Sequence, residues 1–341
     1  MNLRRAAELK LNGLTHRLRR LPIVTLMPHS RCNCRCIMCD IWKANREGKS
    51  LAESEVVGLL SDFRRLGVEW VLLSGGEPLM HANLWALCGA LKTLPTRITL
   101  LSTGLLLARH APEIVKYCDD VIVSLDGSEA VHDDIRAVPH AFRQLAEGVE
   151  ALKTSKPHYP VSGRCVLQRR NFADLPNIIA AAKAIGLDRI SFLAADVSTT
   201  AFNRPEGWPA DRAAEVSLSS DETGTFAAVV EETIVRYASD FASGFIAESP
   251  ARLRGLVTYF RAVNGEGDFA QISCNAPWAS AVIEADGTVR PCFFHAPFGN
   301  IRERGLYEIL NSSGAIAFRQ SLDVHQNAIC RRCVCTVKIV G

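Results

Sequence analysis

Short apolar segments rich in β-branched residues alternate with segments of helical periodicity from residue 23 to residue 194. The apolar segments predict strands at Ile23 to Pro28, Trp70 to Ser74, Arg97 to Ser102, Asp120 to Leu125, Val161 to Gln168 and Arg189 to Ala194. The periodic segments predict helices at Ala52 to Gly67, Asn83 to Thr93, Ala108 to Tyr117, Ala141 to Lys153 and Ala173 to Gly186. A repeat of roughly 30 residues is typical of βα units, so the pattern predicts a parallel sheet.

Six consecutive βα units place the chain in the α/β class. Gly67 and Gly186 end two of the helical segments, as is typical of helix C-termini. With right-handed crossovers, such a chain forms either a doubly wound sheet or an incomplete barrel. In barrel folds the loops that follow the strands carry the catalytic residues, and a cysteine-rich loop follows the first strand here.

The regular alternation stops near residue 196, and three other segments flank it. Residues 1–22 place leucines among basic residues, which predicts an amphipathic helix that docks on the barrel, with a membrane-surface helix as the alternative. Residues 201–270 contain a loop-like stretch and two helical runs, Ser220 to Ser239 and Pro250 to Val263, which predict a linker or lid. We therefore divide the chain into residues 1–22, 23–200, 201–270 and a cysteine-rich tail, 271–341.

The composition excludes several classes of protein. The chain has 341 residues, of which 48% are hydrophobic and 22% charged, so it can bury a large core. A net charge of +3 gives no reason to expect a nucleic-acid partner. Arginines recur up to the first predicted strand, which excludes a secretory signal, and no apolar run is long enough to span a bilayer. We expect a soluble, cytoplasmic protein with no stable membrane insertion.

Twelve cysteines in so large a chain favour metal ligation over disulfide bonds, because no secretory signal places the chain in an oxidising compartment. Most of them gather in two groups. The isolated ones, Cys88, Cys118 and Cys165, lie within apolar elements and are expected to be core residues.

The first group contains Cys32, Cys36 and Cys39, which place three thiolates on one short loop. Three ligands hold a cubic iron-sulfur cluster and leave one iron open to bind a small molecule, as catalytic metal sites do. The alternative is a structural zinc knuckle with Cys34 as the fourth ligand. Four cysteines within eight residues fit tetrahedral zinc poorly, so we expect Cys34 to take no part.

The sequence Gly75-Gly-Glu-Pro78 ends the second predicted strand. Paired glycines let the backbone approach a ligand closely, and the carboxylate of Glu77 can accept hydrogen bonds from an ammonium group. Taken alone, the tetrapeptide also fits an ordinary turn. Its position one βα unit after the cysteine loop makes it a more specific indication of a binding site.

Together, the three cysteines of the first loop and the Gly-Gly-Glu-Pro turn resemble the two hallmark motifs of the radical S-adenosylmethionine superfamily. The resemblance covers about residues 20 to 200 and implies a partial (β/α)6 TIM-like barrel. It implies that Cys32, Cys36 and Cys39 hold a [4Fe-4S] cluster whose open iron binds the amino and carboxylate groups of S-adenosylmethionine. The turn formed by Gly75, Gly76, Glu77 and Pro78 would then order the amino group.

The resemblance also implies cofactor contacts at the ends of later strands. Ser102 and Ser124, with Asp126, stand where the family commonly contacts the ribose and sulfonium side of the cofactor, and Arg136 could pair with its carboxylate. The alternatives are that the hydroxyl and carboxylate groups bond only to the following turn and that Arg136 is a surface charge. Asn171, after the fifth strand, fits the same rim.

The second group lies in the tail and resembles the SPASM or twitch module of the same superfamily. An Asp-Gly turn within Glu284 to Pro291 predicts a hairpin, and Leu306 to Gln320 predicts a helix. A full SPASM module holds two auxiliary clusters and has about seven cysteines, whereas this tail has five, so we expect one auxiliary [4Fe-4S] cluster. Its expected ligands are Cys274, Cys292, Cys330 and Cys333. Cys335 could replace Cys333, and a zinc ribbon is the alternative for the module.

By this resemblance the protein is a radical S-adenosylmethionine enzyme of oxidoreductase type. An external one-electron reductant such as flavodoxin or ferredoxin would drive cleavage of S-adenosylmethionine to a 5'-deoxyadenosyl radical, which abstracts hydrogen from a small polar substrate. The auxiliary cluster would assist a net two-electron oxidation. The alternatives are a peptide or cofactor maturation enzyme and a non-catalytic iron-sulfur or zinc protein that transfers electrons or acts as a scaffold. Catalytic residues stay unknown, and Asp196, Asn203 and Arg204 are candidates to face substrate.

Overall fold

The computed structural model of the protein describes residues 3–339. Its strands are β1 Ile23–His29, β2 Trp70–Gly75, β3 Arg97–Ser102, β4 Asp120–Ser124, β5 Val161–Leu167, β6 Arg189–Ala194, β7 Ser280–Ile283, β8 Thr288–Arg290 and β9 Gly299–Asn300. Its α-helices are α1 Leu3–Thr15, α2 Glu53–Leu66, α3 Leu84–Leu91, α4 Leu107–Tyr117, α5 Glu129–Arg136, α6 Ala141–Ser155, α7 Leu175–Ala184, α8 Ala210–Val216, α9 Ser220–Arg236, α10 Ala238–Ser243, α11 Pro250–Val263, α12 Ala276–Ala279, α13 Leu306–Leu310, α14 Ser313–Ser321 and α15 Ala328–Arg331. Short 3-10 helices are η1 Ile41–Glu47, η2 Pro78–Met80 and η3 Phe172–Asp174.

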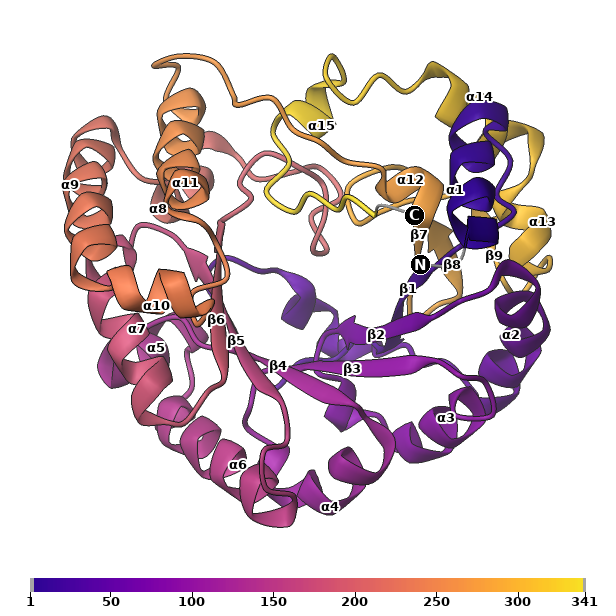
Figure 1. Ribbon diagram of the computed structural model, residues 1–341, viewed down its shortest axis with the longest axis horizontal. Coiled ribbons are helices and arrows are strands. Elements are labelled where there is room, and N and C mark those ends of the chain that lie inside the picture. The colour runs from indigo at the N-terminus through magenta and orange to yellow at the C-terminus, as the bar shows by residue number, and fades with distance from the viewer. Residues whose placement is uncertain (1–2, 340–341) are drawn as a thin grey trace.

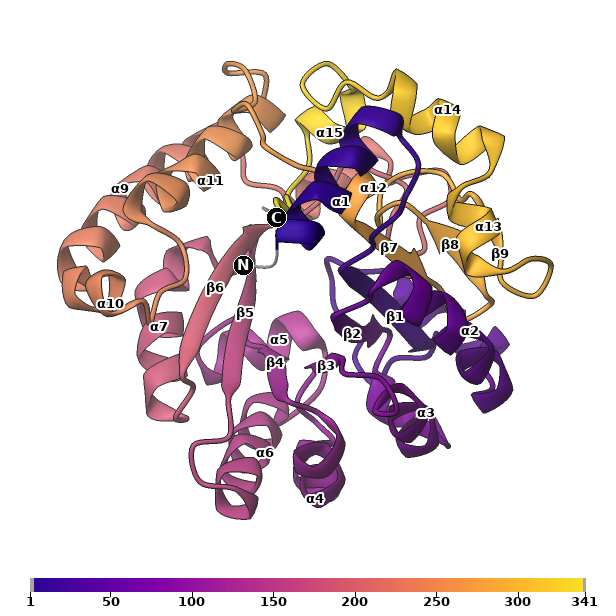
Figure 2. The ribbon, with the colours of Figure 1, turned by 45° about the vertical axis from the view of Figure 1, so that its right-hand side comes forward.

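The strands form one open sheet in the order β6-β5-β4-β3-β2-β1-β7-β8-β9. β1 to β6 run parallel in chain order, so the crossover helices cover the outer side of a curved sheet (Figures 1 and 2). This arrangement confirms the predicted α/β class and the incomplete barrel. The carboxyl ends of the six strands meet at one rim, where the cysteine loop and the strand-end motifs are gathered.

The hydrophobic pattern explains the barrel. The residues of β1 and β2 that face the core, such as Val24, Leu26, Val71 and Leu73, are fully buried, because strands covered on both faces need apolar side chains. The predicted strands agree with the structure within one residue at each end, and the five predicted barrel helices agree within two.

Helix α5 is missing from the sequence prediction. It has only eight residues, and the buried ones include the polar His132 and Arg136, so few apolar positions mark it in the sequence. The predicted helix Leu306 to Gln320 is also wrong, because the structure divides it into α13 and α14. Asn311 interrupts it by bonding the backbone of Leu18 through both amide atoms, and Ser312 then caps α14.

The C-terminal segment shares the barrel sheet. The predicted hairpin is present as β7 and β8, and β7 lies parallel to β1, with Val24 opposite Ala281. The module predicted to begin at residue 271 therefore extends the sheet and covers the edge of β1 that would otherwise be unpaired. The last residues of that module, 340 and 341, lie outside the described residues, as do residues 1 and 2 of the N-terminal segment.

The N-terminal helix contacts mainly the C-terminal module. Asn12 of α1 donates to the carbonyl of Trp278, at 2.9 Å, and Arg319 of α14 donates to the carbonyl of His16, at 2.7 Å. Ion pairs from Arg5 and Arg20 to Glu69 join the same segment to the barrel. The predicted docking on the barrel is therefore only part of the contacts of this segment, because it also connects the barrel with the C-terminal module.

The segment between β6 and the C-terminal module covers the other sheet edge. α9 and α11, both close to their predicted ranges, pack on each other, and α11 also contacts β6. Ile246 forms a parallel bridge with Ile190 of β6. Within residues 3–339, no helix has both the length and the apolar character needed to cross a membrane.

Candidate active site at the barrel rim

The cysteine loop between β1 and α2 rests on the glycine turn that follows β2. The N–H of Glu77 donates to the carbonyl of Arg31, at 2.8 Å, and a Cβ on Gly76 would lie 2.0 Å from that same oxygen. Gly75 has φ +111°, which favours glycine. The two glycines are therefore required for the turn to pack beneath the cysteine loop, a reason beyond the ligand approach expected from the sequence.

The carboxylate of Glu77 is fully buried and held by four donors. They are the N–H of Leu79, the hydroxyl of Ser102, and both the N–H and the hydroxyl of Thr103, at 2.6 to 3.1 Å. Burial raises the pKa of Glu77, and these donors oppose the rise. Ser102 thus lies against Glu77, and its predicted contact with the cofactor stays a prediction. Sequence reasoning missed Thr103, although it directly follows Ser102.

Arg136 lies inside the site and is not a surface charge. It is only 6% exposed, forms an ion pair with Asp126, and places Nη1 3.5 Å from Sγ of Cys36. A hydrogen bond from Cys34 and the charge of Arg136 lower the pKa of the Cys36 thiol to about 7, against the opposing effect of burial. Among the described residues, Nε of Arg136 has no hydrogen-bond partner. The alternative interpretation of Arg136 is therefore wrong.

The other predicted rim residues have more local roles. Asp126 also accepts a hydrogen bond from the N–H of Val166, and Asn171 donates to the carbonyl of Asp126, at 2.8 Å in both cases. Asn171 is fully buried, so it holds the ends of β4 and β5 together. Ser124 ends β4 and is partly exposed at the rim.

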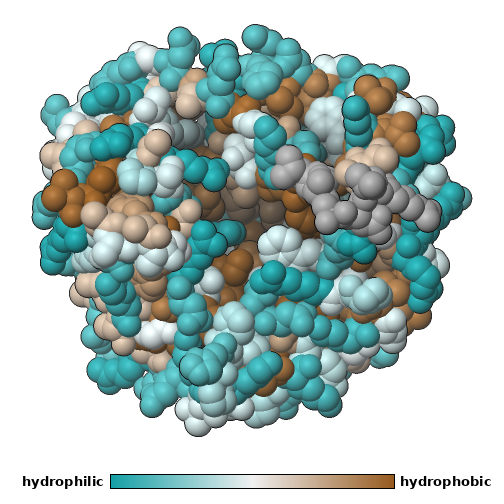
Figure 3. Space-filling view, in the orientation of Figure 1, coloured by the Kyte–Doolittle hydropathy of each residue, from teal (hydrophilic) through white to brown (hydrophobic). Residues whose placement is uncertain are grey.

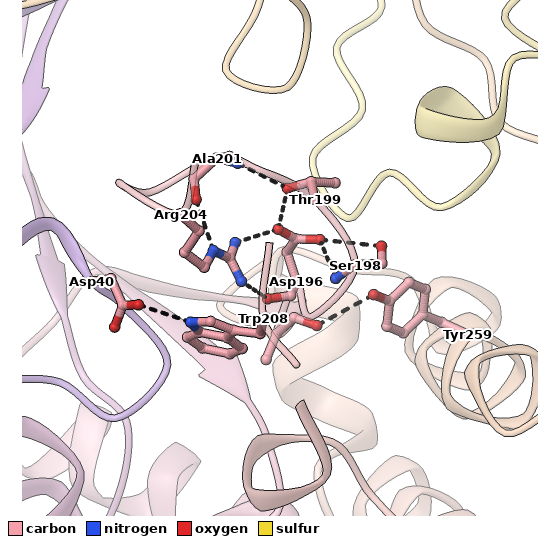
Figure 4. Close-up of polar contacts among 9 residues, drawn as sticks. Asp40, Asp196, Ser198, Thr199, Ala201, Arg204, Trp208 and Tyr259 are labelled. Carbon is pink, nitrogen blue, oxygen red and sulfur yellow. Dashed lines mark hydrogen bonds and ion pairs between the residues drawn. The ribbon is translucent and has the colours of Figure 1, made fainter. Parts of the chain in front are cut away.

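The segment after β6 also hydrogen-bonds to the cysteine loop. Nε1 of Trp208 donates to Asp40, the residue after Cys39, at 2.8 Å (Figure 4). Asn203 donates to the Asp40 carbonyl, at 3.1 Å, and Arg212 donates to the carbonyl of Ile37. We refer to residues 196–212 as the lid segment. Its contacts fix the backbone on both sides of Cys39.

Asp196 and Arg204 brace the lid segment. Their side chains form a buried ion pair, and Arg204 also donates to the carbonyls of Asp196 and Ala201, at 2.8 and 2.7 Å (Figure 4). Thr199 bonds the same carboxylate. Asp196 and Arg204 are candidates to face substrate. Their polar groups bond mostly within the lid segment. The third candidate, Asn203, is exposed at the cavity described below.

Replacement of Arg204 by methionine should destabilise the protein by roughly 3–5 kcal/mol, because it leaves the carboxylate of Asp196 buried without its cation. Arg254→Met is the matched control. Arg254 pairs with Glu231 on the surface, where solvent screens the pair and its loss has little effect on stability. Urea unfolding followed by circular dichroism measures both. Equal unfolding midpoints for the two variants would contradict the bracing role.

All five cysteines of the tail gather beside the hairpin. Burial and the charges of Cys292 and Cys274 raise the pKa of the Cys330 thiol to about 12. Cys333 and Cys335 also interact with Cys274, and Arg164 of β5 lowers the pKa of Cys335 against the larger, opposite effect of burial. Cys335 thus belongs to the same group as the four cysteines predicted to be ligands.

A cavity of about 460 Å³ is lined by residues of the barrel rim, the lid segment and the C-terminal hairpin. It reaches Gly75 and Gly76 at the turn, Phe202 and Asn203 of the lid segment, and Phe293 beside Cys292. The rings of Phe202 and Phe293 stack with centroids 6.3 Å apart, which joins the lid segment to the C-terminal module. Figure 3 shows that this face of the molecule is hollowed near its middle, with apolar residues inside the hollow.

The residues fit iron-sulfur clusters by their donor chemistry. Each group offers at least three thiols, and a guanidinium group reaches each group, from Arg136 at the first and from Arg164 at the second. Within residues 3–339, no three His, Cys, Asp or Glu side chains converge closely enough to hold a single metal ion.

Comparison with protein families identifies both regions. Residues 26–182 match the model of the radical SAM superfamily, and residues 274–334 match the SPASM iron-sulfur cluster-binding domain. The first matched region contains Cys32, Cys36 and Cys39, and the second contains Cys274, Cys292, Cys330 and Cys333.

Curated relatives include several enzymes of tetrapyrrole and peptide chemistry. A pre-heme d1 synthase of Dinoroseobacter shibae is 29% identical over 196 residues, which are 56% of this chain and 48% of that protein. A PqqA peptide cyclase of Ruegeria pomeroyi is 25% identical over 316 residues, 89% of this chain and 77% of that protein. The chain spans about half the length of the first curated relatives that it matches.

Solved structures share the fold. SuiB of Streptococcus suis bound to S-adenosylmethionine is 14% identical, with a TM-score of 0.64 over 96% of this chain and 75% of that chain. Native anSMEcpe with bound AdoMet is 17% identical, with a TM-score of 0.66 over 90% of this chain and 84% of that chain.

Proposed function

Because the chain belongs to the radical SAM superfamily and carries a SPASM iron-sulfur domain, we propose that it removes hydrogen from a substrate bound between the barrel and the C-terminal module, in a net two-electron oxidation. The observation that carries this proposal is the cavity of about 460 Å³, because residues from the glycine turn, the lid segment and the hairpin beside Cys292 all line it. A substrate in this cavity would contact chain neighbours of both cysteine groups, such as Ile41, two residues after Cys39, and Phe293, directly after Cys292.

The residues that would hold the cofactors come from the strand ends and the tail. Cys32, Cys36 and Cys39 are the proposed ligands of the first [4Fe-4S] cluster, and the auxiliary cluster takes Cys274, Cys292, Cys330 and Cys333. When bound, S-adenosylmethionine and its cluster supply a 5'-deoxyadenosyl radical that takes a hydrogen atom, and the auxiliary cluster supplies an acceptor for the electron that the substrate loses. The proposed cofactor-binding residues are Gly75, Gly76, Glu77, Pro78, Ser102, Ser124, Asp126 and Arg136.

The residues of the chain orient the methionine part of S-adenosylmethionine. Four donors keep the carboxylate of Glu77 in one position, so it presents a fixed acceptor for the amino group. Arg136 lies beside Cys36 with one nitrogen unpartnered among the described residues, which suits a carboxylate near the open iron. Holding these groups in place before binding reduces the entropy lost when the reaction geometry forms.

The polar groups of the cavity favour a small polar substrate. Lys49 pairs with Asp286 across it, at 3.0 Å, and Arg290 pairs with Glu284, at 2.8 Å. These pairs place both signs of charge on the wall, and Asn203 adds an amide. An external one-electron reductant, such as flavodoxin or ferredoxin, would supply electrons to the first cluster.

A second candidate function is the modification of a peptide or a cofactor precursor. The similarity to a PqqA peptide cyclase extends over 89% of this chain and therefore includes both the barrel and the tail. In that case the cavity would take one side chain of the substrate, and the rest would lie outside it. Assays with peptides and with small polar compounds separate the two candidates.

Anaerobic reconstitution tests the proposed cofactors. The protein should bind about eight irons per chain, as two [4Fe-4S] clusters require. With a strong reductant and S-adenosylmethionine, it should release 5'-deoxyadenosine, measured by liquid chromatography, and omission of the reductant should stop the release. Binding of zinc with no cleavage of S-adenosylmethionine would contradict the proposed function.

A further inference from the structure

We propose that His295 is a positioning residue of the auxiliary site that donates a hydrogen bond to Cys330 and thereby raises the reduction potential of the auxiliary cluster. The proposal rests on the proposed function, because it takes Cys330 to be a cluster ligand. It adds a hydrogen-bond donor, an imidazole N–H, to a site for which the sequence indicates only thiols.

The imidazole of His295 lies directly against the Cys330 thiol. Nε2 is 3.3 Å from Sγ of Cys330, and the side chain is only 4% exposed. The ring packs edge-on against Phe318 of α14, with centroids 5.0 Å apart, and Phe318 packs in turn on Phe298. The aromatic neighbours therefore hold the imidazole in one orientation.

The backbone of the same residue reaches a second cysteine. Burial raises the pKa of the Cys292 thiol, and hydrogen bonds from the backbone N–H groups of Phe294 and His295 oppose the rise. The carbonyl of His295 accepts from Arg290 of β8, at 3.1 Å, which anchors the residue to the hairpin. His295 thus connects Cys292, beside the hairpin, with Cys330, near the C-terminus.

The direction of the side-chain hydrogen bond follows from chemistry. A cysteine that ligates iron is a thiolate and has no proton to donate, so Nε2 of His295 must carry the proton. The contact is therefore an N–H donor on a ligand sulfur.

Such a bond changes the potential in a defined direction. A donor on a cluster sulfur stabilises the reduced state more than the oxidised state, because the reduced cluster carries more negative charge. Removal of the donor should lower the midpoint potential. A higher potential makes the auxiliary cluster a better acceptor for the electron that substrate oxidation releases.

The test uses the full-length chain with Cys32, Cys36 and Cys39 replaced by alanine, so that iron binds only at the tail. Iron content in this background tests the auxiliary site itself, independently of His295. A redox titration followed by electron paramagnetic resonance then compares His295, His295→Gln and His295→Phe. We expect a lower midpoint for His295→Phe, which keeps the aromatic packing, and a midpoint near that of the parent for His295→Gln, which keeps a donor.

Pulsed electron paramagnetic resonance adds a second measurement on the reduced cluster. A weak nitrogen coupling that disappears in His295→Phe supports the hydrogen bond, whereas a strong coupling would make His295 an iron ligand and overturn the proposal. An unchanged midpoint in His295→Phe would also overturn it. If that variant holds no iron, His295→Ala with and without imidazole replaces it: restoration of the midpoint by imidazole supports the donor role, and no change contradicts it.

Discussion

Cys36→Ala should lower the formation of 5'-deoxyadenosine to background and should reduce the iron content from about eight to about four per chain. Cys36 is the central residue of the first cysteine group, and Arg136 contacts its thiol directly. With only two of the three thiolates left, the loop cannot hold a cluster with one open iron. Chromatography of the nucleoside and a colorimetric iron assay measure the two effects.

Cys34→Ala is the control for this substitution. Cys34 is buried in the same loop and its thiol hydrogen-bonds to both Cys32 and Cys36, yet its spacing lies outside the three-cysteine motif. We expect Cys34→Ala to keep both clusters and to keep forming 5'-deoxyadenosine. A zinc knuckle would need Cys34 as its fourth ligand, so loss of metal from the first site in Cys34→Ala would contradict the proposed site.

Gly76→Ala should lower the rate of 5'-deoxyadenosine formation by on the order of 100-fold, since a displacement of about 1 Å at a reacting group has effects of that size. The added Cβ would lie 2.0 Å from the carbonyl oxygen of Arg31, one residue before Cys32. The backbone of the cysteine loop must therefore move away from the turn. The rate is measured on protein that is reconstituted anaerobically and matched for iron content.

The control is Gly58→Ala, in which the new Cβ on α2 meets no neighbouring atom within 4 Å. This substitution should leave the rate unchanged and favour the helix slightly, because alanine has the higher helix propensity. Circular dichroism should show native secondary structure for both variants. A Gly76→Ala protein as active as Gly58→Ala would mean that the turn does not support the cysteine loop.

The barrel can be predicted from the sequence because local patterns of apolar residues mark its strands and most of its helices. The strand segments of β1 to β6 are short and separated by helical segments, so their limits agree with the structure within one residue. Helix α5 escapes the same method because its buried residues include His132 and Arg136, whose partners lie in other elements. Periodicity detects apolar burial, and it does not detect a buried polar group whose partner lies outside the helix.

The candidate site likewise contains residues that local patterns predict and residues that they do not. The spacing of Cys32, Cys36 and Cys39 lies within one short loop, so the sequence alone indicates an iron-sulfur centre there. Thr103 and His295 could not be chosen from the sequence, because each acts through a partner far away in the chain, Glu77 and Cys330 respectively. Their neighbours in the chain give no signal of these contacts.

The sequence by itself determined the α/β class, the first cysteine group and the turn that accompanies it, because each depends on residues close together in the chain. Only the tertiary structure decided that β7 pairs with β1, that Trp208 of the lid segment bonds to Asp40 of the cysteine loop, and that the glycine turn supports that loop. These features depend on packing between segments that are tens to hundreds of residues apart. Long-range burial and pairing set them, and no local pattern records which distant segment will supply the partner.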